Sequence, residues 1–494
     1  MRCTEKFIWA LSLLASPSLS HSHIDAADVS PTNANHIFNA IHSALRHWES
    51  GIKHNGVSFF LASIPNGTQF YHGTGSSQPI NGIEWLAFVP EHALGFAHRS
   101  EWRRPHNEKK RSVTFQESQH PLDPIVDGQD HTDGTIDGAS DLAGHGYLHI
   151  YAATKDLRLL YVDGISAGPR GSMQSQDRIL FNDTIGHPKP GPKPPIGGPP
   201  REQERAIEAC RMVKEVWGER IDGLVRTEQG FEIILCEFSR DLDVVHISQT
   251  KPQDKTNSDD EKKYKSQRKA QNKADTDGEG SHKQDHKSRP DGHRGSRGPQ
   301  GDCCSLAARH DQLIGHKVRL DFDEFVTAYT YDLDLFPNNA SQPVLENIPT
   351  EQLEPIRRDI NHMINTMEPS PYAFDWQAVA DMIVTRYSDE LDILAKGHFA
   401  STTLLRERLE KLLEPFLDYS DFNASNAVAD RCQNEFIPHT APVGTLGGSV
   451  VRSVSRRVCS TLVSGLFDRM DLDKTVVSFG ELVSFLGWAT LESK

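Results

Sequence analysis

A fifty-residue stretch of charged and small polar residues divides this chain and limits where a folded core can form. Residues 251–300 contain 13 Lys/Arg and 9 Asp/Glu, and their apolar surface comes from Tyr264, Ala270 and Ala274. Such a stretch cannot bury enough apolar area to offset the conformational entropy lost on folding. We therefore predict a disordered charged linker over residues 249–301. The 494-residue chain is long enough for a domain on each side of it.

The part before the linker predicts an α+β domain over residues 30–248. Apolar and β-branched runs indicate strands at 57–64, 146–153 and 157–162, and a hairpin formed by 221–225 and 231–238. Helical spacing of apolar residues indicates helices over 30–50 and 202–217. Residues 100–143 are polar and rich in Asp and Gly, so we expect a disordered insertion there.

The part after the linker, residues 302–494, predicts a helical domain. Apolar residues recur at helical steps from Trp376 to Leu394, and amphipathic patterns continue over 403–417, 427–436 and 450–467. The predicted fold class is therefore an α+β domain followed by a disordered linker and a disulfide-bonded helical domain.

The first 20 residues have the pattern of a secretory signal peptide. Arg2 and Lys6 precede a short apolar core, and Ser18-Leu19-Ser20 is a candidate cleavage site. No later run of about 18 apolar residues follows, so we expect a secreted protein without a membrane span. The formal charge of −15 argues against nucleic-acid binding, which requires a basic face.

Secretion changes how the cysteines are interpreted. Six cysteines remain after the signal, and an even number in an oxidising compartment indicates disulfides. Local pairs, Cys210 with Cys236 and Cys432 with Cys459, are the simplest pairing, while the adjacent Cys303 and Cys304 are left open. No CxxC pair occurs, so no structural zinc site is expected. Four N-x-S/T sequons, at Asn66, Asn182, Asn339 and Asn423, agree with a secreted glycoprotein.

Residues 67–97 contain the motif that points most specifically to a functional site. A turn at Pro65-Asn66-Gly67 precedes a predicted strand that ends in His72-Gly73-Thr74. A second predicted strand covers 84–89, and Pro90-Glu91 opens a short helix. This succession resembles the ADP-ribosyltransferase fold, in the branch of diphtheria toxin and poly-ADP-ribose polymerase.

The resemblance implies an NAD site. His72 would donate a hydrogen bond to the ribose, and Gly73 would let its backbone meet the nicotinamide amide. Trp85 or Phe88 would stack on the nicotinamide ring, although this family usually has Tyr at that position. Glu232, which opens the strand GFEIILCEF, would stabilise oxocarbenium-like charge in the transition state.

Two other functions remain open. Gly164-Ile165-Ser166-Ala167-Gly168 matches the G-x-S-x-G elbow of serine hydrolases, but Pro169-Arg170-Gly171 after it is a poor start for the required helix. The chain also resembles uncharacterised secreted proteins of filamentous fungi through LRLLYVDGISAG and GFEIILCEF, which implies architecture but no activity. A non-enzymatic secreted binding protein is therefore the main alternative. The sequence does not identify the partner of such a protein, and a protein target is one candidate.

Overall fold

The computed structural model describes most of the chain outside the N-terminus and the charged linker. The described residues are 33–46, 56–97, 146–164, 166, 175–185, 201–227, 231–250, 317–368, 373–421, 424–468 and 470–492. The predicted signal peptide, the 100–143 insertion and all of the predicted linker after residue 250 lie outside them. So do Cys303, Cys304 and Asn423.

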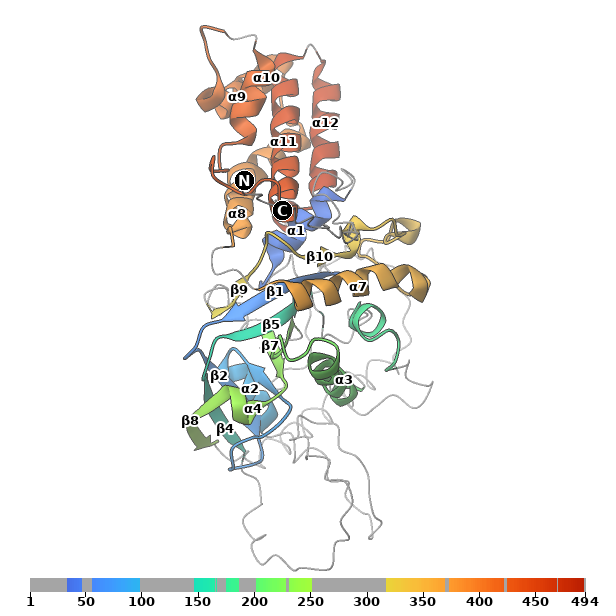
Figure 1. The fold of residues 1–494 in the computed structure, drawn as a ribbon. Coiled ribbons are helices and arrows are strands. Elements are labelled where there is room, and N and C mark those ends of the chain that lie inside the picture. Colours follow the sequence, from blue (N-terminus) through green and yellow to red (C-terminus); the bar gives the residue numbers. More distant parts are fainter. Residues whose placement is uncertain are drawn as a thin grey trace, which may run out of the picture.

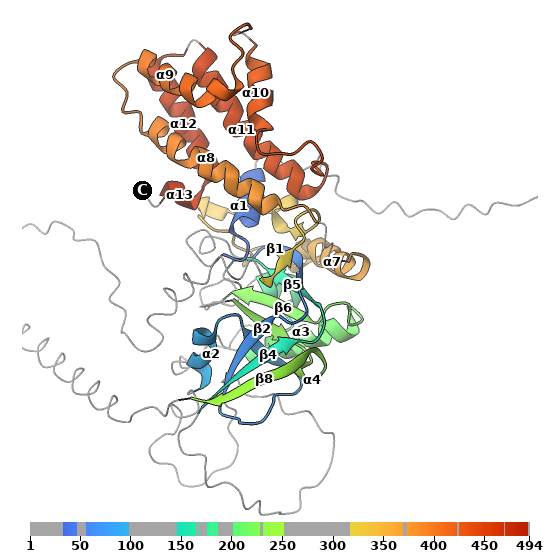
Figure 2. The ribbon, with the colours of Figure 1, turned by 90° about the vertical axis from the view of Figure 1, so that its left-hand side faces the viewer.

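One mixed sheet forms the centre of the first part of the molecule (Figures 1 and 2). Its order is β10-β1-β5-β6-β7-β3-β2-β4-β8, and β9 also pairs with β1. Only the β5–β6 pairing among these is parallel. The strands are β1 Ser58–Ile64, β2 Gln69–Thr74, β3 Glu84–Ala87, β4 Tyr147–Ala153, β5 Leu157–Val162, β6 Gly223–Thr227, β7 Phe231–Leu235, β8 Leu242–Gln249, β9 Arg319–Leu320 and β10 Val326–Thr327.

The central strands are buried on both faces, which explains their continuous apolar sequences. In β1, SFFLASI, every residue but Ser63 is buried, and β5, LRLLYV, is buried except at Arg158. The edge strand β8 is different, because Val244 and Val245 are 43% and 49% exposed. The predicted strands and the 221–238 hairpin are confirmed, whereas β8, β9 and β10 were not predicted.

One group of helices lies against the sheet, and a second group forms a bundle beyond it (Figures 1 and 2). The helices are α1 Ala34–Ser43, α2 Pro90–Ala97, η4 Ser175–Leu180, α3 Glu202–Glu215, α4 Phe238–Asp241, η5 Ala328–Thr330, η6 Pro337–Asn339, α7 Thr350–Thr366, α8 Trp376–Lys396, α9 Thr402–Leu413, η7 Glu414–Phe416, α10 Ser425–Gln433, α11 Leu446–Phe467, α12 Leu472–Leu486 and α13 Ala489–Glu492. The predicted bundle helices α8 to α11 are confirmed.

The two parts of the molecule exchange elements across the predicted boundary. Helix α1 packs against α8, α11 and α12 of the bundle, and the Asn39 Nδ2 donates to the Leu486 carbonyl at 2.8 Å. In the other direction, β9 and β10 pair with β1 of the sheet. A single buried apolar cluster includes residues from both parts. The sequence predicted α1 in the α+β domain, and the structure places it against the bundle.

Two disulfides link neighbouring elements. Cys210 of α3 bonds Cys236 after β7, and Cys432 of α10 bonds Cys459 of α11. Both pairings agree with the prediction. Among the described residues, no helix is both long enough and apolar enough to cross a membrane.

Candidate functional site

The residues singled out by the sequence lie on three neighbouring strands. Strand β2 pairs with β3 at Tyr71 and Ala87, and β3 pairs with β7 so that Ala87 lies opposite Glu232. His72 and Gly73 are on β2, Trp85 is on β3, and Phe88 follows β3 directly. The sheet therefore brings segments far apart in sequence into direct contact.

A small cavity of about 10 Å³ lies between this part of the sheet and α2, and we call it the α2 cavity. His72, Gly73, Trp85 and Glu232 line it, and Phe88 does not. The full lining is Tyr71, His72, Gly73, Trp85, Leu86, Ala87, His92, Ala93, Phe96 and Glu232. Phe88 packs edge-to-face on Phe70 in the apolar core, with ring centroids 5.5 Å apart.

The side chains of His72 and Glu232 point to opposite faces of the sheet. Tyr71, Ala87 and Glu232 are cross-strand neighbours and share the face that α2 covers. Because side chains alternate along a strand, His72 points to the other face. Its ring lies there against His149, its cross-strand neighbour on β4, and against Phe238, at centroid distances of 6.1 and 6.0 Å.

Gly73 is required by the packing of α2 on the sheet. A Cβ at this position would lie 1.9 Å from the Ala93 carbonyl oxygen of α2. Gly146, just before β4, meets the same helix, where a Cβ would lie 2.1 Å from the Ala97 carbonyl oxygen. The backbone of α2 thus occupies the space beside Gly73 that a ligand bound to the Gly73 backbone would need.

His72 belongs to a buried polar cluster on the face away from α2. Its Nδ1–H donates to the Trp85 carbonyl at 2.8 Å, which leaves Nε2 as a buried acceptor without a partner in the described chain. His149 Nε2–H donates to the Ser76 carbonyl at 2.8 Å, so its Nδ1 can accept from the Tyr151 hydroxyl at 3.0 Å. The Tyr151 oxygen accepts the Ile80 N–H at 3.0 Å.

Burial shifts the pKa values in this cluster in opposite directions. It lowers the pKa of the His72 imidazole to about 4, with the Trp85 hydrogen bond acting in the other sense. It raises the pKa of the neighbouring Glu84 carboxyl well above 4.5, and Glu84 Oε2 has no partner among the described residues. Neutral histidine and protonated glutamate are therefore the forms that this interior favours.

Glu232 belongs to a second buried cluster, on the α2 face. Its cross-strand neighbour on β6 is Arg226, whose guanidinium donates to Glu232 Oε1 at 2.5 Å and is fully buried. Arg226 also pairs with Glu202 in the first turn of α3 and donates to Gln176 Oε1 at 3.2 Å. Burial raises the pKa of the Glu232 carboxyl, although Arg226 opposes that change.

Sequence reasoning missed Arg226 and Glu84, although each leaves a signal. Arg226 and Glu232 lie six residues apart on either side of the hairpin loop, a separation at which a hairpin register can pair them. Glu84 is an acid at the start of an otherwise apolar strand, a position that burial makes costly. Gln176 and Glu202 depend on the packing of η4 and α3, which no local pattern reveals.

Ser166 has the environment of a structural residue. It is fully buried, its hydroxyl donates to the Val162 carbonyl at 2.9 Å, and its hydroxyl oxygen accepts the Thr227 N–H at 3.4 Å. Gln176 donates to its carbonyl. None of these contacts in the described chain supplies the histidine base that a serine nucleophile requires.

The residues do not fit NAD in the way the family resemblance implies. A ribose cannot touch an imidazole and a carboxylate on opposite faces of one sheet, and α2 covers the Gly73 backbone. A cavity of about 10 Å³ is also far smaller than the roughly 300 Å³ or more of typical ligand pockets. Lining by four of the five predicted residues is the feature that agrees with the resemblance.

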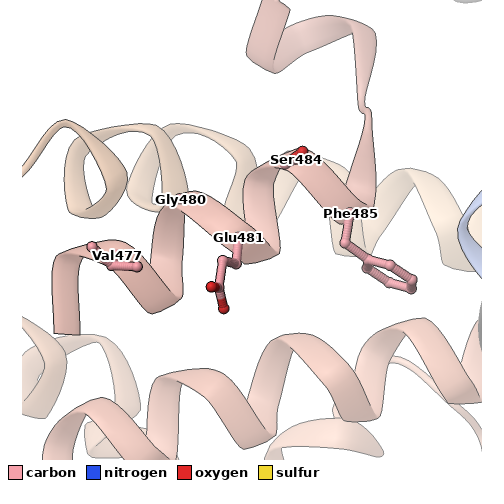
Figure 3. A pocket seen from close by; sticks show the side chains of 5 residues that line it. All are labelled: Val477, Gly480, Glu481, Ser484 and Phe485. Atoms are coloured by element: carbon pink, nitrogen blue, oxygen red, sulfur yellow. The ribbon is translucent and has the colours of Figure 1, made fainter. Parts of the chain in front are cut away.

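A second hollow lies on the bundle, along the outer side of α12. Figure 3 shows the five residues that line it: Val477, Gly480, Glu481, Ser484 and Phe485. They follow one another at helical spacing, and the guanidinium of Arg457 on α11 lies 5.1 Å from the Phe485 ring centroid. The hollow is open and contains one carboxylate, so its lining has fewer polar and charged side chains than that of the α2 cavity.

Comparison with known proteins covers the first half of the chain. Residues 20–258 match the family model of the YPL277C N-terminal domain. Two uncharacterized proteins of Saccharomyces cerevisiae are similar to this chain, each at 32% identity. YPL277C matches over 227 residues, 44% of this chain and 43% of its own length. YOR389W matches over 241 residues, 47% of this chain and 36% of its own length.

The chain therefore spans less than half the length of these relatives. No solved structure matches it. The matched residues contain strands β1 to β8 and both buried polar clusters, whereas β9, β10 and helices α7 to α13 lie outside the match.

Proposed function

We propose that this protein is an exported glycoprotein that acts by binding another molecule and not by catalysis. The placement of His72 and Glu232 on opposite faces of the sheet carries the second part of the proposal. Both side chains are buried and have protein partners of their own, so each has a structural role without any substrate.

Disulfides and sequons support export. Disulfides persist in oxidising compartments, and each of the two pairs links elements within a folded half of the molecule. Three sequon asparagines lie in the described chain and all are exposed: Asn66 and Asn182 on turns, and Asn339 at the end of η6. Exposed turns are accessible to a glycan, whose bulk a buried site would exclude.

The α2 cavity is too small to be the binding site of this proposal, because its volume of about 10 Å³ has room for about one water molecule.

An NAD-dependent ADP-ribosyltransferase is the second candidate. One observation favours it, because His72, Gly73, Trp85 and Glu232 all line the α2 cavity. The two functions differ in whether Glu232 takes part in turnover of NAD.

Two experiments test this proposal. Secretion of the full chain from a eukaryotic host tests export, and an NAD-hydrolysis assay on the purified protein tests the absence of catalysis. We expect protein in the medium whose mass falls on enzymatic removal of N-glycans, and no NAD turnover or calorimetric NAD binding. Turnover that is lost in Glu232→Gln but kept in the exposed α2 variant Glu91→Gln would overturn the proposal in favour of the transferase. Retention of an unglycosylated chain inside the cell would overturn export.

A further inference from the structure

Helix α12 is apolar on more than the face that it buries in the bundle. Residues 475–488 contain one charged residue, Glu481. The buried face consists of Thr475, Phe479, Leu482 and Leu486. A helix at the surface of a globular protein normally carries charged residues on its outer face, whereas a helix that is apolar all round is buried. The outer face of α12 therefore has the composition of a covered surface.

The hollow along this outer face, which we call the α12 hollow, is open and measures about 640 Å³. Its five lining residues follow one another at the spacing of a single helix face (Figure 3). Val477 at one end is 59% exposed, and Phe485 at the other end is half-buried. An open stripe of this kind fits the face of another helix, because small molecules usually bind in sites that enclose most of their surface.

Gly480 lies in the middle of the stripe, where the packing of the bundle does not require a glycine. A Cβ at this position would meet nothing within 4 Å. Glycine inside a helix costs about 1 kcal/mol relative to alanine, because it leaves the unfolded backbone more freedom. The missing side chain leaves room for a large side chain of another molecule to approach the backbone of α12.

Two opposite charges lie beside the hollow, and neither forms an ion pair within the described chain. Glu481 lines the hollow, and the guanidinium of Arg457 on α11 lies 5.1 Å from the Phe485 ring centroid. A second copy of this surface, placed antiparallel about a twofold axis, matches both features. When Phe485 of one copy lies over Gly480 of the other, Glu481 lies opposite Ser484. The Arg457 guanidinium beside Phe485 then meets Glu481 of the other copy.

We propose that this protein forms a twofold-symmetric homodimer through the α12 hollow, with α12 packed antiparallel on α12 of the second copy. Phe485 fills the space above Gly480 of the other copy, and Arg457 pairs with Glu481 of the other copy, twice by symmetry. An interface between two identical surfaces is closed, so association ends at the dimer. The inference is independent of the proposed binding function, and α12 lies outside the residues that match the family model.

Sedimentation equilibrium of the full chain, purified from a eukaryotic host, tests the dimer. The native mass is compared with that of the reduced and denatured chain, so that attached glycans contribute equally to both. We expect the native mass to approach twice the chain mass as the concentration rises from about 1 to 100 µM. A native mass of one chain throughout this range would overturn the inference.

A valine substitution locates the interface. Val477→Lys puts a charge into the apolar stripe, where dimerisation would remove it from water, so we expect the dimer to weaken by about 10-fold or more. Val245→Lys on the edge strand β8 is the matched control, because Val245 is 49% exposed and lies in the sheet. It should dimerise as the wild type does. Equal dimer affinities of the two variants would mean that the hollow is not the interface.

Gly480→Gln separates the interface from the fold. Glutamine favours helix over glycine and its Cβ meets nothing in the described chain, so the monomer should be at least as stable as the wild type. The same side chain occupies the space that Phe485 of the second copy needs, so dimerisation should weaken. A folded Gly480→Gln protein that dimerises as tightly as the wild type contradicts the proposed packing.

A charge swap tests the pairing of Arg457 with Glu481. Arg457→Glu or Glu481→Arg alone places like charges opposite each other at two symmetric positions, and each should weaken the dimer by about 10-fold or more. The double variant restores opposite charges and should recover most of the lost affinity. A double variant that dimerises no more tightly than either single variant would exclude this pairing and the proposed arrangement with it.

Discussion

At the scale of single residues, burial determines the chemistry of the sheet more than sequence motifs do. Glu84 and His72 lie on the same face, both are buried, and each has a polar atom without a partner in the described chain. Burial raises the pKa of Glu84 and lowers the pKa of His72. A sequence pattern shows which residues could ionise, but not which are held neutral.

Glu84→Gln should stabilise the protein at neutral pH more than at acid pH. Below a pH of about 4.3, Glu84 is protonated in both the native and the unfolded state, so its ionisation does not lower the free energy of unfolding. Above this pH, the unfolded state releases the proton while the native state keeps it. The free energy of unfolding of the wild type therefore falls by about 1.4 kcal/mol per pH unit until the pH reaches the raised native pKa of Glu84. Urea unfolding of wild type and variant at pH values of about 4.5 and 7.5, on either side of this loss, measures the difference.

The exposed α2 variant Glu91→Gln serves as the control for charge removal alone. A Glu84→Gln effect of the same size at both pH values would mean that the native carboxyl titrates normally.

At the scale of elements, the packing of α2 on β2 and β4 shapes the candidate site. Gly73 and Gly146 let the helix backbone approach the strands closely, and the small residues Ala93 and Ala97 face them. The same contact leaves space for the α2 cavity next to it. The glycine that suggested a nucleotide site thus makes a helix–sheet contact.

Gly73→Ala should displace α2 and destabilise the protein by about 1–3 kcal/mol or more. Its Cβ would meet the Ala93 carbonyl, and backbone cannot move aside as a flexible side chain can. Chemical denaturation gives the free energy of unfolding, and hydrogen exchange of the α2 amides reports the local effect.

Gly95→Ala on the same helix is the matched control, because a Cβ there meets nothing within 4 Å. Since Ala favours helix over Gly, this control should be neutral or stabilising by up to about 1 kcal/mol. If Gly73→Ala is as stable as Gly95→Ala, the close contact is not important to the fold.

At the scale of the whole molecule, the sheet and the bundle share one core. The rings of Phe38 in α1 and Trp488 after α12 lie 5.9 Å apart, and Phe60 of β1 stacks on Phe325 at 4.4 Å. The Arg46 guanidinium after α1 donates to both oxygens of Asp381 in α8, at 2.7 and 2.5 Å. These contacts join segments from both sides of the charged linker.

The shared core predicts that the two halves unfold together. Replacing Cys432 and Cys459 with Ser removes a crosslink 27 residues apart in sequence, which should cost roughly 3 kcal/mol. Because the core is continuous, amides of β5 in the sheet should lose protection together with amides of α8. Hydrogen exchange followed by mass spectrometry measures both, and loss confined to the bundle would contradict the coupling.

The sequence predicted the local elements of the candidate site well. The strand ending in His72-Gly73, the strand from Glu84, the helix from Pro90 and the hairpin with Glu232 all appear, because alternation, turn residues and capping act over a few residues. The two disulfides were predictable for the same reason, since each joins elements close in sequence.

Only the tertiary structure decided which side chains meet. Moving one residue along a strand reverses the face to which a side chain points, so strand pairing separates His72 from Glu232 although both lie in the predicted strands. Likewise, α1 joins the bundle and β9 and β10 join the sheet through contacts between residues hundreds of positions apart. Local sequence determines the elements, whereas the faces they bury depend on packing energy summed over the whole chain.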